Sequence, residues 1–119
     1  MIPAEFNVRI TVREHAVVVE LPAPDPSSAR STSELTKALR EWALAERPGR
    51  VVLDSSGLQT LTSALLGLMA DLCKHVRAGG GTVRVAGLAP RLAAVFRMTR
   101  LDQLFTFHET VDEAVAAFG

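Results

Sequence analysis

The hydrophobic pattern of residues 50–81 predicts a buried strand, a polar loop and an apolar helix. Residues 51–53 are continuously apolar, which is typical of a strand covered on both faces. From residue 63 onward, apolar residues recur at helical spacing and form one face, which comprises Leu65, Leu68, Met69, Leu72 and Val76 and is widened by Leu66 and Cys73. The three glycines at residues 79–81 end this helix, because glycine adopts the left-handed conformation that a helix end needs.

The chain before residue 50 predicts a hairpin followed by a helix. Apolar and polar residues alternate along residues 6–13, which indicates a strand with one solvated face, and residues 16–21 form a second, better buried strand that pairs with it. Residues 22–28 contain three prolines and are expected to be a loop, because proline lacks the donor that helices and central strands need. A helix then begins near residues 31–33 and ends by residues 47–49, with Trp42 in the core.

The chain after residue 81 continues the alternation of strands and helices. We expect a strand at residues 82–86, a helix after Pro90, a short strand at residues 104–107 and a last helix whose start carries a capping box at residues 110–113. Strands separated by helices pair in parallel through right-handed crossovers, and the first hairpin adds antiparallel pairing. The sequence therefore predicts one α/β domain over residues 1–119, with a mixed, mostly parallel sheet of four to five strands and about four helices.

Charge gives no sign of a nucleic-acid partner, but it is unevenly distributed. Thirteen basic and thirteen acidic residues cancel, so no global field attracts nucleic acid. Residues 74–100 contain six basic and no acidic residues, whereas residues 101–119 contain four acidic and no basic ones. Two interpretations stay open for the basic stretch: ordinary solvated faces, or a surface for an acidic protein partner.

The cysteine count and the absence of long apolar runs favour a cytoplasmic protein. Cys73 is the only cysteine, so no intrachain disulfide can form and we expect a reducing compartment. We find no secretory signal and no apolar run of the roughly 20 residues that a membrane helix needs. We therefore expect no membrane insertion.

Candidate catalytic and metal-binding residues are sparse. His15, His75 and His108 lack metal-ligand spacing to one another or to Cys73, so we expect no metal and no cofactor. The glycines at residues 79–81 follow a helix, whereas phosphate-binding glycine loops precede one. An enzyme is the least favoured hypothesis, because no convergent set of titratable groups is visible.

The most informative polar residues lie where the central helix begins. The start of a helix favours negative charge, so a serine there is a natural place for a phosphate, which would add roughly two negative charges. The alternative is that Thr60, Thr62 and Ser63 only cap the helix. The residues themselves leave both interpretations open.

The order and spacing of these pieces resemble the STAS domain family of anti-sigma factor antagonists over nearly the whole chain. The resemblance is carried by the strand that ends Val51-Val52-Leu53-Asp54, the glycine break, the strand at residues 83–86, Pro90 and Val95-Phe96. It implies a STAS-like fold for the sheet and helices predicted above.

The resemblance also implies a site at the start of the central helix. Family members of the switching type carry a serine there, in an Asp-Ser-Ser-Gly-like motif that a partner kinase phosphorylates. Ser63 lies 16 residues before Gly79 and matches this position, whereas Ser55 lies 24 residues before it and does not. Around Ser63 the motif differs, with Thr62, Ala64 and Leu65 in place of its aspartate, second serine and glycine.

The resemblance implies a non-enzymatic regulatory domain that binds an anti-sigma factor with serine kinase activity of the GHKL type in a partner switch. It implies control by phosphorylation of Ser63. The residues expected to contact the partner are Gln59, Thr60, Thr62, Ser63, Ala64, Leu65 and Leu66. The altered motif favours an alternative, in which the protein is an unswitched STAS scaffold or an accessory subunit of a larger signalling or transport complex. The sequence makes no prediction of the oligomeric state.

Overall fold

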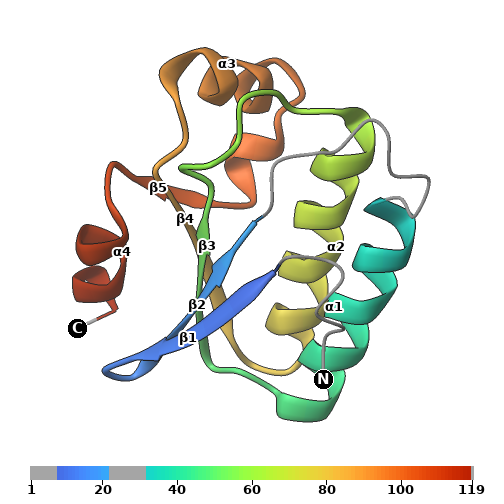
Figure 1. Ribbon diagram of the computed structural model, residues 1–119, viewed down its shortest axis with the longest axis vertical. Helices are drawn as coiled ribbons and strands as arrows, with labels where there is room; N and C mark the ends of the chain where they lie inside the picture. The colour runs from blue at the N-terminus through green and yellow to red at the C-terminus, as the bar shows by residue number, and fades with distance from the viewer. Residues whose placement is uncertain (1–7, 22–31, 119) are drawn as a thin grey trace.

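The computed structural model describes residues 8–21 and 32–118, which form a five-stranded sheet with helices on both faces (Figure 1). In chain order the elements are β1 (Arg9–Arg13), β2 (Ala16–Glu20), α1 (Thr32–Glu46), β3 (Arg50–Asp54), α2 (Ser63–Ala78), β4 (Thr82–Ala86), α3 (Pro90–Met98), the 3-10 helix η2 (Leu101–Gln103), β5 (Thr106–His108) and α4 (Val111–Ala117). The expected loop at residues 22–28 lies outside the described residues.

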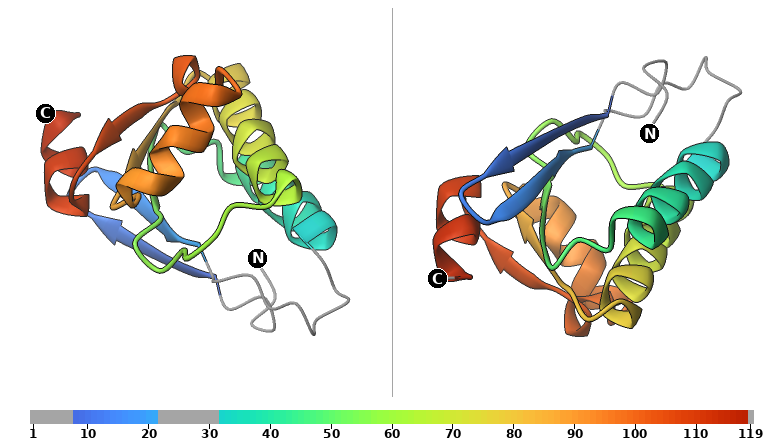
Figure 2. Two further views of the ribbon diagram at one scale, coloured as in Figure 1. Left: turned by 90° about the horizontal axis from the view of Figure 1, so that it is seen from above. Right: turned by 90° about the horizontal axis from the view of Figure 1, so that it is seen from below.

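The spatial order of the strands is the same as their order in the chain. β1 pairs antiparallel with β2, and every other neighbouring pair is parallel. Because successive right-handed crossovers step in one direction across the sheet, α1, α2 and α3 cover the same face. α4 follows the last strand and lies on the opposite face (Figures 1 and 2). The predicted mixed, mostly parallel α/β sheet is confirmed.

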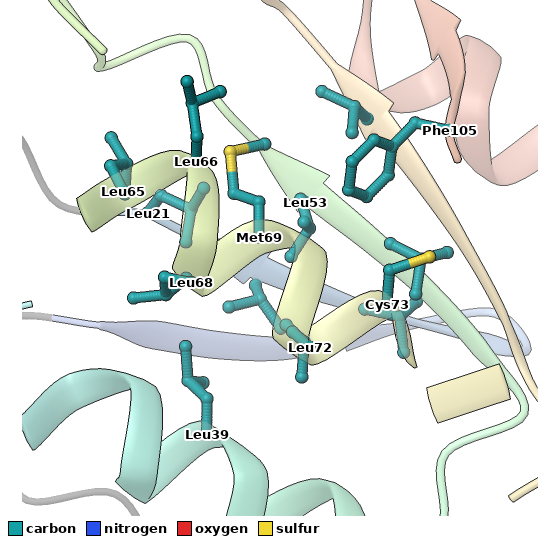
Figure 3. Packing of buried hydrophobic residues seen from close by; sticks show 14 of the residues in the cluster. Leu21, Leu39, Leu53, Leu65, Leu66, Leu68, Met69, Leu72, Cys73 and Phe105 are labelled. Carbon is teal, nitrogen blue, oxygen red and sulfur yellow. The ribbon is translucent and has the colours of Figure 1, made fainter. Parts of the chain in front are cut away.

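Two apolar clusters hold the layers together, and β3 contributes to both. Val51 and Leu53 face the helices α1 to α3 in the larger cluster, together with all seven apolar α2 residues predicted from the sequence (Figure 3). Val52 points the other way and packs with Ala114 and Val115 of α4. The three central residues of β3 are 0% exposed, as expected of a strand covered on both faces.

Two elements near the ends of the chain differ from the prediction. The last strand was expected at residues 104–107, but Leu104 closes a turn by donating its N–H to the Leu101 carbonyl (3.0 Å), and β5 begins only at Thr106, opposite Arg84. Phe105 is buried ahead of the strand. At the other end, Val12 is 71% exposed, although the alternation of apolar and polar residues along residues 6–13 assigned it to the apolar side of the strand. β1 is an edge strand, and its far end projects beyond the helices (Figure 1).

Candidate functional site

The loop between β3 and α2 begins at the carboxyl edge of the parallel strands, where backbone hydrogen bonds fix it. Ser55 N–H donates to the Ala86 carbonyl (2.9 Å), and Leu58 N–H donates to the Ser55 carbonyl (3.1 Å). The Ser56 hydroxyl and N–H both donate to Oδ1 of Asp54, at 2.7 and 3.1 Å. The first half of the loop is therefore a tight polar turn that continues the sheet.

The two serines of this turn are poor targets for another protein. Ser55 is 0% exposed, and its Oγ has no hydrogen-bond partner within the part of the chain that the structure describes. Ser56 is exposed, but its hydroxyl is held by Asp54. The sequence Asp-Ser-Ser-Gly at residues 54–57 matches the expected motif. It nevertheless offers no serine hydroxyl that is both exposed and free of a hydrogen bond.

The start of α2 assigns different roles to the two adjacent hydroxyl residues. Thr62 has extended backbone angles, and its Oγ1 accepts a hydrogen bond from the Leu65 N–H at 3.0 Å, so it is the N-cap. Ser63 is the first helical residue and is exposed. Among the described residues, nothing hydrogen-bonds to the Ser63 hydroxyl. Capping therefore belongs to Thr62 and leaves the serine hydroxyl open to solvent.

The predicted contact residues divide into an exposed set and a buried set. The exposed residues are Gln59, Thr60, Thr62, Ser63 and Ala64. Leu65 and Leu66 are only 4% and 9% exposed and belong to the core cluster (Figure 3). The helical turn points these two leucines towards the sheet, so the expectation that they add an apolar contact for a partner does not hold. Their packing in the core cluster holds the first turns of α2 in place.

The loop is supported by an arginine on α3 that no sequence pattern singled out. Nη1 of Arg91 donates to the Gln59 carbonyl at 2.7 Å and links the start of α3 to the approach to α2. The two residues are 32 positions apart in the chain. No local pattern signals such a contact, because it depends on the crossover that brings α3 beside the loop.

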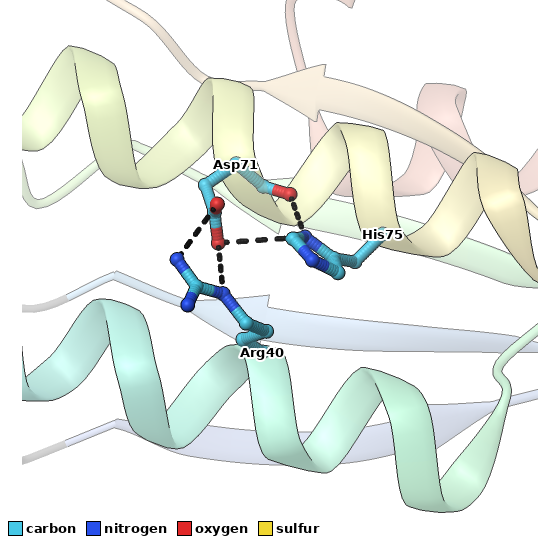
Figure 4. A network of polar contacts seen from close by, with 3 residues as sticks. All are labelled: Arg40, Asp71 and His75. Carbon is cyan, nitrogen blue, oxygen red and sulfur yellow. Dashed lines mark hydrogen bonds and ion pairs between the residues drawn. The ribbon is translucent and has the colours of Figure 1, made fainter.

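A groove of about 550 Å³ runs beside the site between the first halves of α1 and α2. Its lining comprises Ser33, Glu34, Thr36, Lys37, Arg40, Ala64, Gly67 and Leu68. Farther along the same helix pair, Nε and Nη2 of Arg40 contact both carboxylate oxygens of Asp71 at 3.2 and 3.0 Å (Figure 4). His75 contacts the Asp71 backbone oxygen through Nδ1 at 2.8 Å. The hydrogen bond that Arg40 donates to the Asp71 carboxylate raises the pKa of Arg40, and this network ties α1 to α2.

The described residues do not assemble a metal site or a nucleophile. No group of three His, Cys, Asp or Glu side chains in residues 8–21 and 32–118 is placed to hold a metal ion. His108 lies 3.0 Å from Nη1 of Arg84, His75 lies against Asp71, and His15 is exposed in the hairpin turn. Burial raises the pKa of the Cys73 thiol, although nearby Arg77 opposes this. What the site offers is an exposed hydroxyl at the positive end of a helix.

Comparison with solved structures shows the same fold in proteins of low sequence identity. An anti-sigma factor antagonist from Mycobacterium paratuberculosis matches with a TM-score of 0.74 and 23% identity, over 92% of this chain and 91% of that one. The Bacillus cell fate determinant SpoIIAA, in its phosphorylated form, matches with a TM-score of 0.68 and 16% identity, over 94% and 99%. The murine anion transporter Slc26a9 matches with a TM-score of 0.70 and 12% identity, over 96% of this chain but 19% of the transporter.

The helices within the described residues include none long and apolar enough to cross a membrane. The family model of the STAS domain matches residues 7–114. This match leaves out only a short segment at each end, and the sheet and helices agree with the solved relatives. The chain therefore belongs to the STAS domain family.

Proposed function

We propose that this protein is a non-enzymatic regulatory module of the cytoplasm, which binds an anti-sigma factor with serine kinase activity of the GHKL type in a partner switch. The contact surface consists of Gln59, Thr60, Thr62, Ser63 and Ala64. The observation that carries the proposal is the exposed Ser63 hydroxyl at the first residue of α2, beside a cap that Thr62 already makes. The similarity to anti-sigma factor antagonists supports the class of partner.

Phosphorylation of Ser63 would control this contact through charge. The amides at the start of α2 and the helix macrodipole favour an anion there, so the modified chain keeps its fold. The phosphate adds roughly two negative charges to a surface that must lose water when a partner docks. The burial of Ser55 argues against that serine as the target. SpoIIAA, which shares this fold, has been solved in a phosphorylated form.

The test uses purified GHKL kinases from the source genome, each incubated with this protein and ATP and analysed by mass spectrometry. We expect a phosphate on Ser63, none in the Ser63→Ala variant, and unchanged labelling in Ser56→Ala, which removes another exposed serine hydroxyl from the same loop. Ser63→Asp should weaken kinase binding by about tenfold or more, because it places a charge at the contact.

Two results would contradict this assignment. One is a phosphate on Ser55 or Ser56 in the native protein. The other is kinase binding by the Ser63→Asp variant that equals wild-type binding, since the charge at that position would then have no effect on the contact.

A second candidate is an unswitched STAS subunit that acts as a scaffold or as part of a transport complex. The observation that favours it is the altered motif, in which Leu65 takes the place of the usual glycine and is buried in the core. The transporter Slc26a9 contains a segment of the same fold. This candidate predicts a stable complex without a kinase, in which Ser63→Ala and Ser63→Asp assemble as the wild type does.

A further inference from the structure

The outer side of α3 and the residues just after it form an exposed basic surface around a methionine. Met98 is 84% exposed, the most exposed of the large apolar side chains in the described part of the chain. Arg91 lies about two helical turns before it, on the same side of α3, and Arg97 and Arg100 flank it in sequence. All three arginines are exposed. We call Arg91, Arg97, Met98 and Arg100 the α3 face.

The charges of the α3 face have no acidic partner in the described part of the chain. Elsewhere Arg9 pairs with Glu20 at 3.4 Å and Arg40 with Asp71 at 3.0 Å, whereas Arg47, Arg50, Arg77 and Arg84 form no ion pair with a described residue. No ion pair among residues 8–21 and 32–118 involves an arginine of the α3 face. Arg100 also has a backbone φ of 62°, in the left-handed region that disfavours residues other than glycine. Within the described chain, Arg91 donates to the Gln59 carbonyl, whereas the side chains of Arg97 and Arg100 make no hydrogen bond or ion pair.

The α3 face is continuous with the surface around Ser63. Arg91 belongs to both, because its Nη1 donates to the Gln59 carbonyl at 2.7 Å while its helix carries Arg97 and Met98. In Figure 1, the loop that leads into α2 passes next to α3, and the view from above in Figure 2 shows the two side by side. A protein that covers Gln59 to reach Ser63 therefore meets α3 next.

We propose that the α3 face is the second half of the partner contact, and that the partner presents carboxylates around an apolar socket that receives Met98. This inference rests on the proposed function, which supplies the partner. An arginine without an acidic partner can bind a carboxylate through bidentate hydrogen bonds. The flexible side chain of methionine can fill an irregular apolar pocket. Arginine and methionine are also enriched in protein interfaces relative to the rest of the protein surface.

The test compares two charge reversals with the same change in net charge. The Arg97→Glu/Arg100→Glu variant changes the α3 face. The Arg50→Glu/Lys74→Glu variant changes two exposed basic residues, at the first residue of β3 and late in α2. Binding is measured to each purified GHKL kinase that retains the wild-type protein, at low and high salt. Thermal melting of each variant confirms that it folds.

At low salt we expect the α3-face reversal to lower the association rate constant by about a hundredfold, and the control reversal to lower it by less than about threefold. Added salt should slow the wild type and narrow this difference, because it screens the charges. Met98→Ala should increase the dissociation rate constant by about tenfold, since it removes an apolar anchor without changing charge.

The outcomes separate this inference from the function on which it rests. If a kinase binds the wild type, and the α3-face reversal associates as fast as the wild type or no more slowly than the control reversal, the inference is overturned while the kinase contact stands. If no GHKL kinase binds the wild type, the proposed function fails and the inference fails with it.

Discussion

Replacing Thr62 with alanine tests whether this residue, and not Ser63, caps α2. Oγ1 of Thr62 accepts the Leu65 N–H at 3.0 Å, one of the amides that a helix start leaves without an internal partner. Loss of such a cap costs about 1 kcal/mol of unfolding free energy. For a chain of 119 residues this corresponds to a fall in Tm of about 4 °C.

The assay is urea denaturation followed by the fluorescence of Trp42, the only tryptophan, which is half-buried against the core. Thr62→Ser keeps the accepting oxygen and should unfold nearly as the wild type does. Ser63→Ala is the matched neighbour, and it should stay within about 0.5 kcal/mol of the wild type because the hydroxyl it removes is exposed and bonds to no described residue.

The opposite pattern would refute the reasoning about the site. If Ser63→Ala cost about as much as Thr62→Ala, the serine hydroxyl would be part of the helix cap. Phosphorylation would then compete with the cap that holds α2 in place, and the proposed switch would lose its structural basis.

Four further predictions concern three residues away from the loop. Gly81→Ala should destabilise the fold by about 3 kcal/mol in the same denaturation assay, since its Cβ would lie 2.3 Å from the Pro48 carbonyl oxygen and 2.7 Å from a methyl group of Val76. Gly67→Ala should instead stabilise it by about 0.8 kcal/mol, because this exposed glycine lies inside α2 with nothing within 4 Å of the added atom. The raised pKa of the Cys73 thiol predicts slow alkylation by iodoacetamide at pH 8 unless the chain is unfolded. The same shift means that the unfolded chain loses this proton first, so stability should fall as the pH rises through the thiol range, an effect that Cys73→Ala should remove.

The predictions from sequence succeeded best where local signals were strong. The bounds of β3, α2 and β4 agree with the structure, because an apolar run, a threonine cap and a glycine stop each act over a few neighbouring residues. The capping threonine of α4 was also found, and Thr110 accepts the Glu113 N–H at 3.1 Å. The choice of Ser63 over Ser55 came from family spacing, and the burial of Ser55 agrees with it.

The predictions failed where a residue's surroundings come from distant parts of the chain. The start of β5 depends on its ladder with β4, which no signal in residues 104–107 encodes. Arg91 reaches the site through a crossover, which no pattern within α3 encodes.

By itself the sequence determined the elements, their order and the parallel sheet, since backbone geometry and apolar periodicity are properties of neighbouring residues. Only the tertiary structure decided which hydroxyl stays exposed, where β5 begins and which arginines have no acidic partner. Burial and charge pairing depend on contacts between residues far apart in the chain, and these exist only once the helices have packed against the sheet.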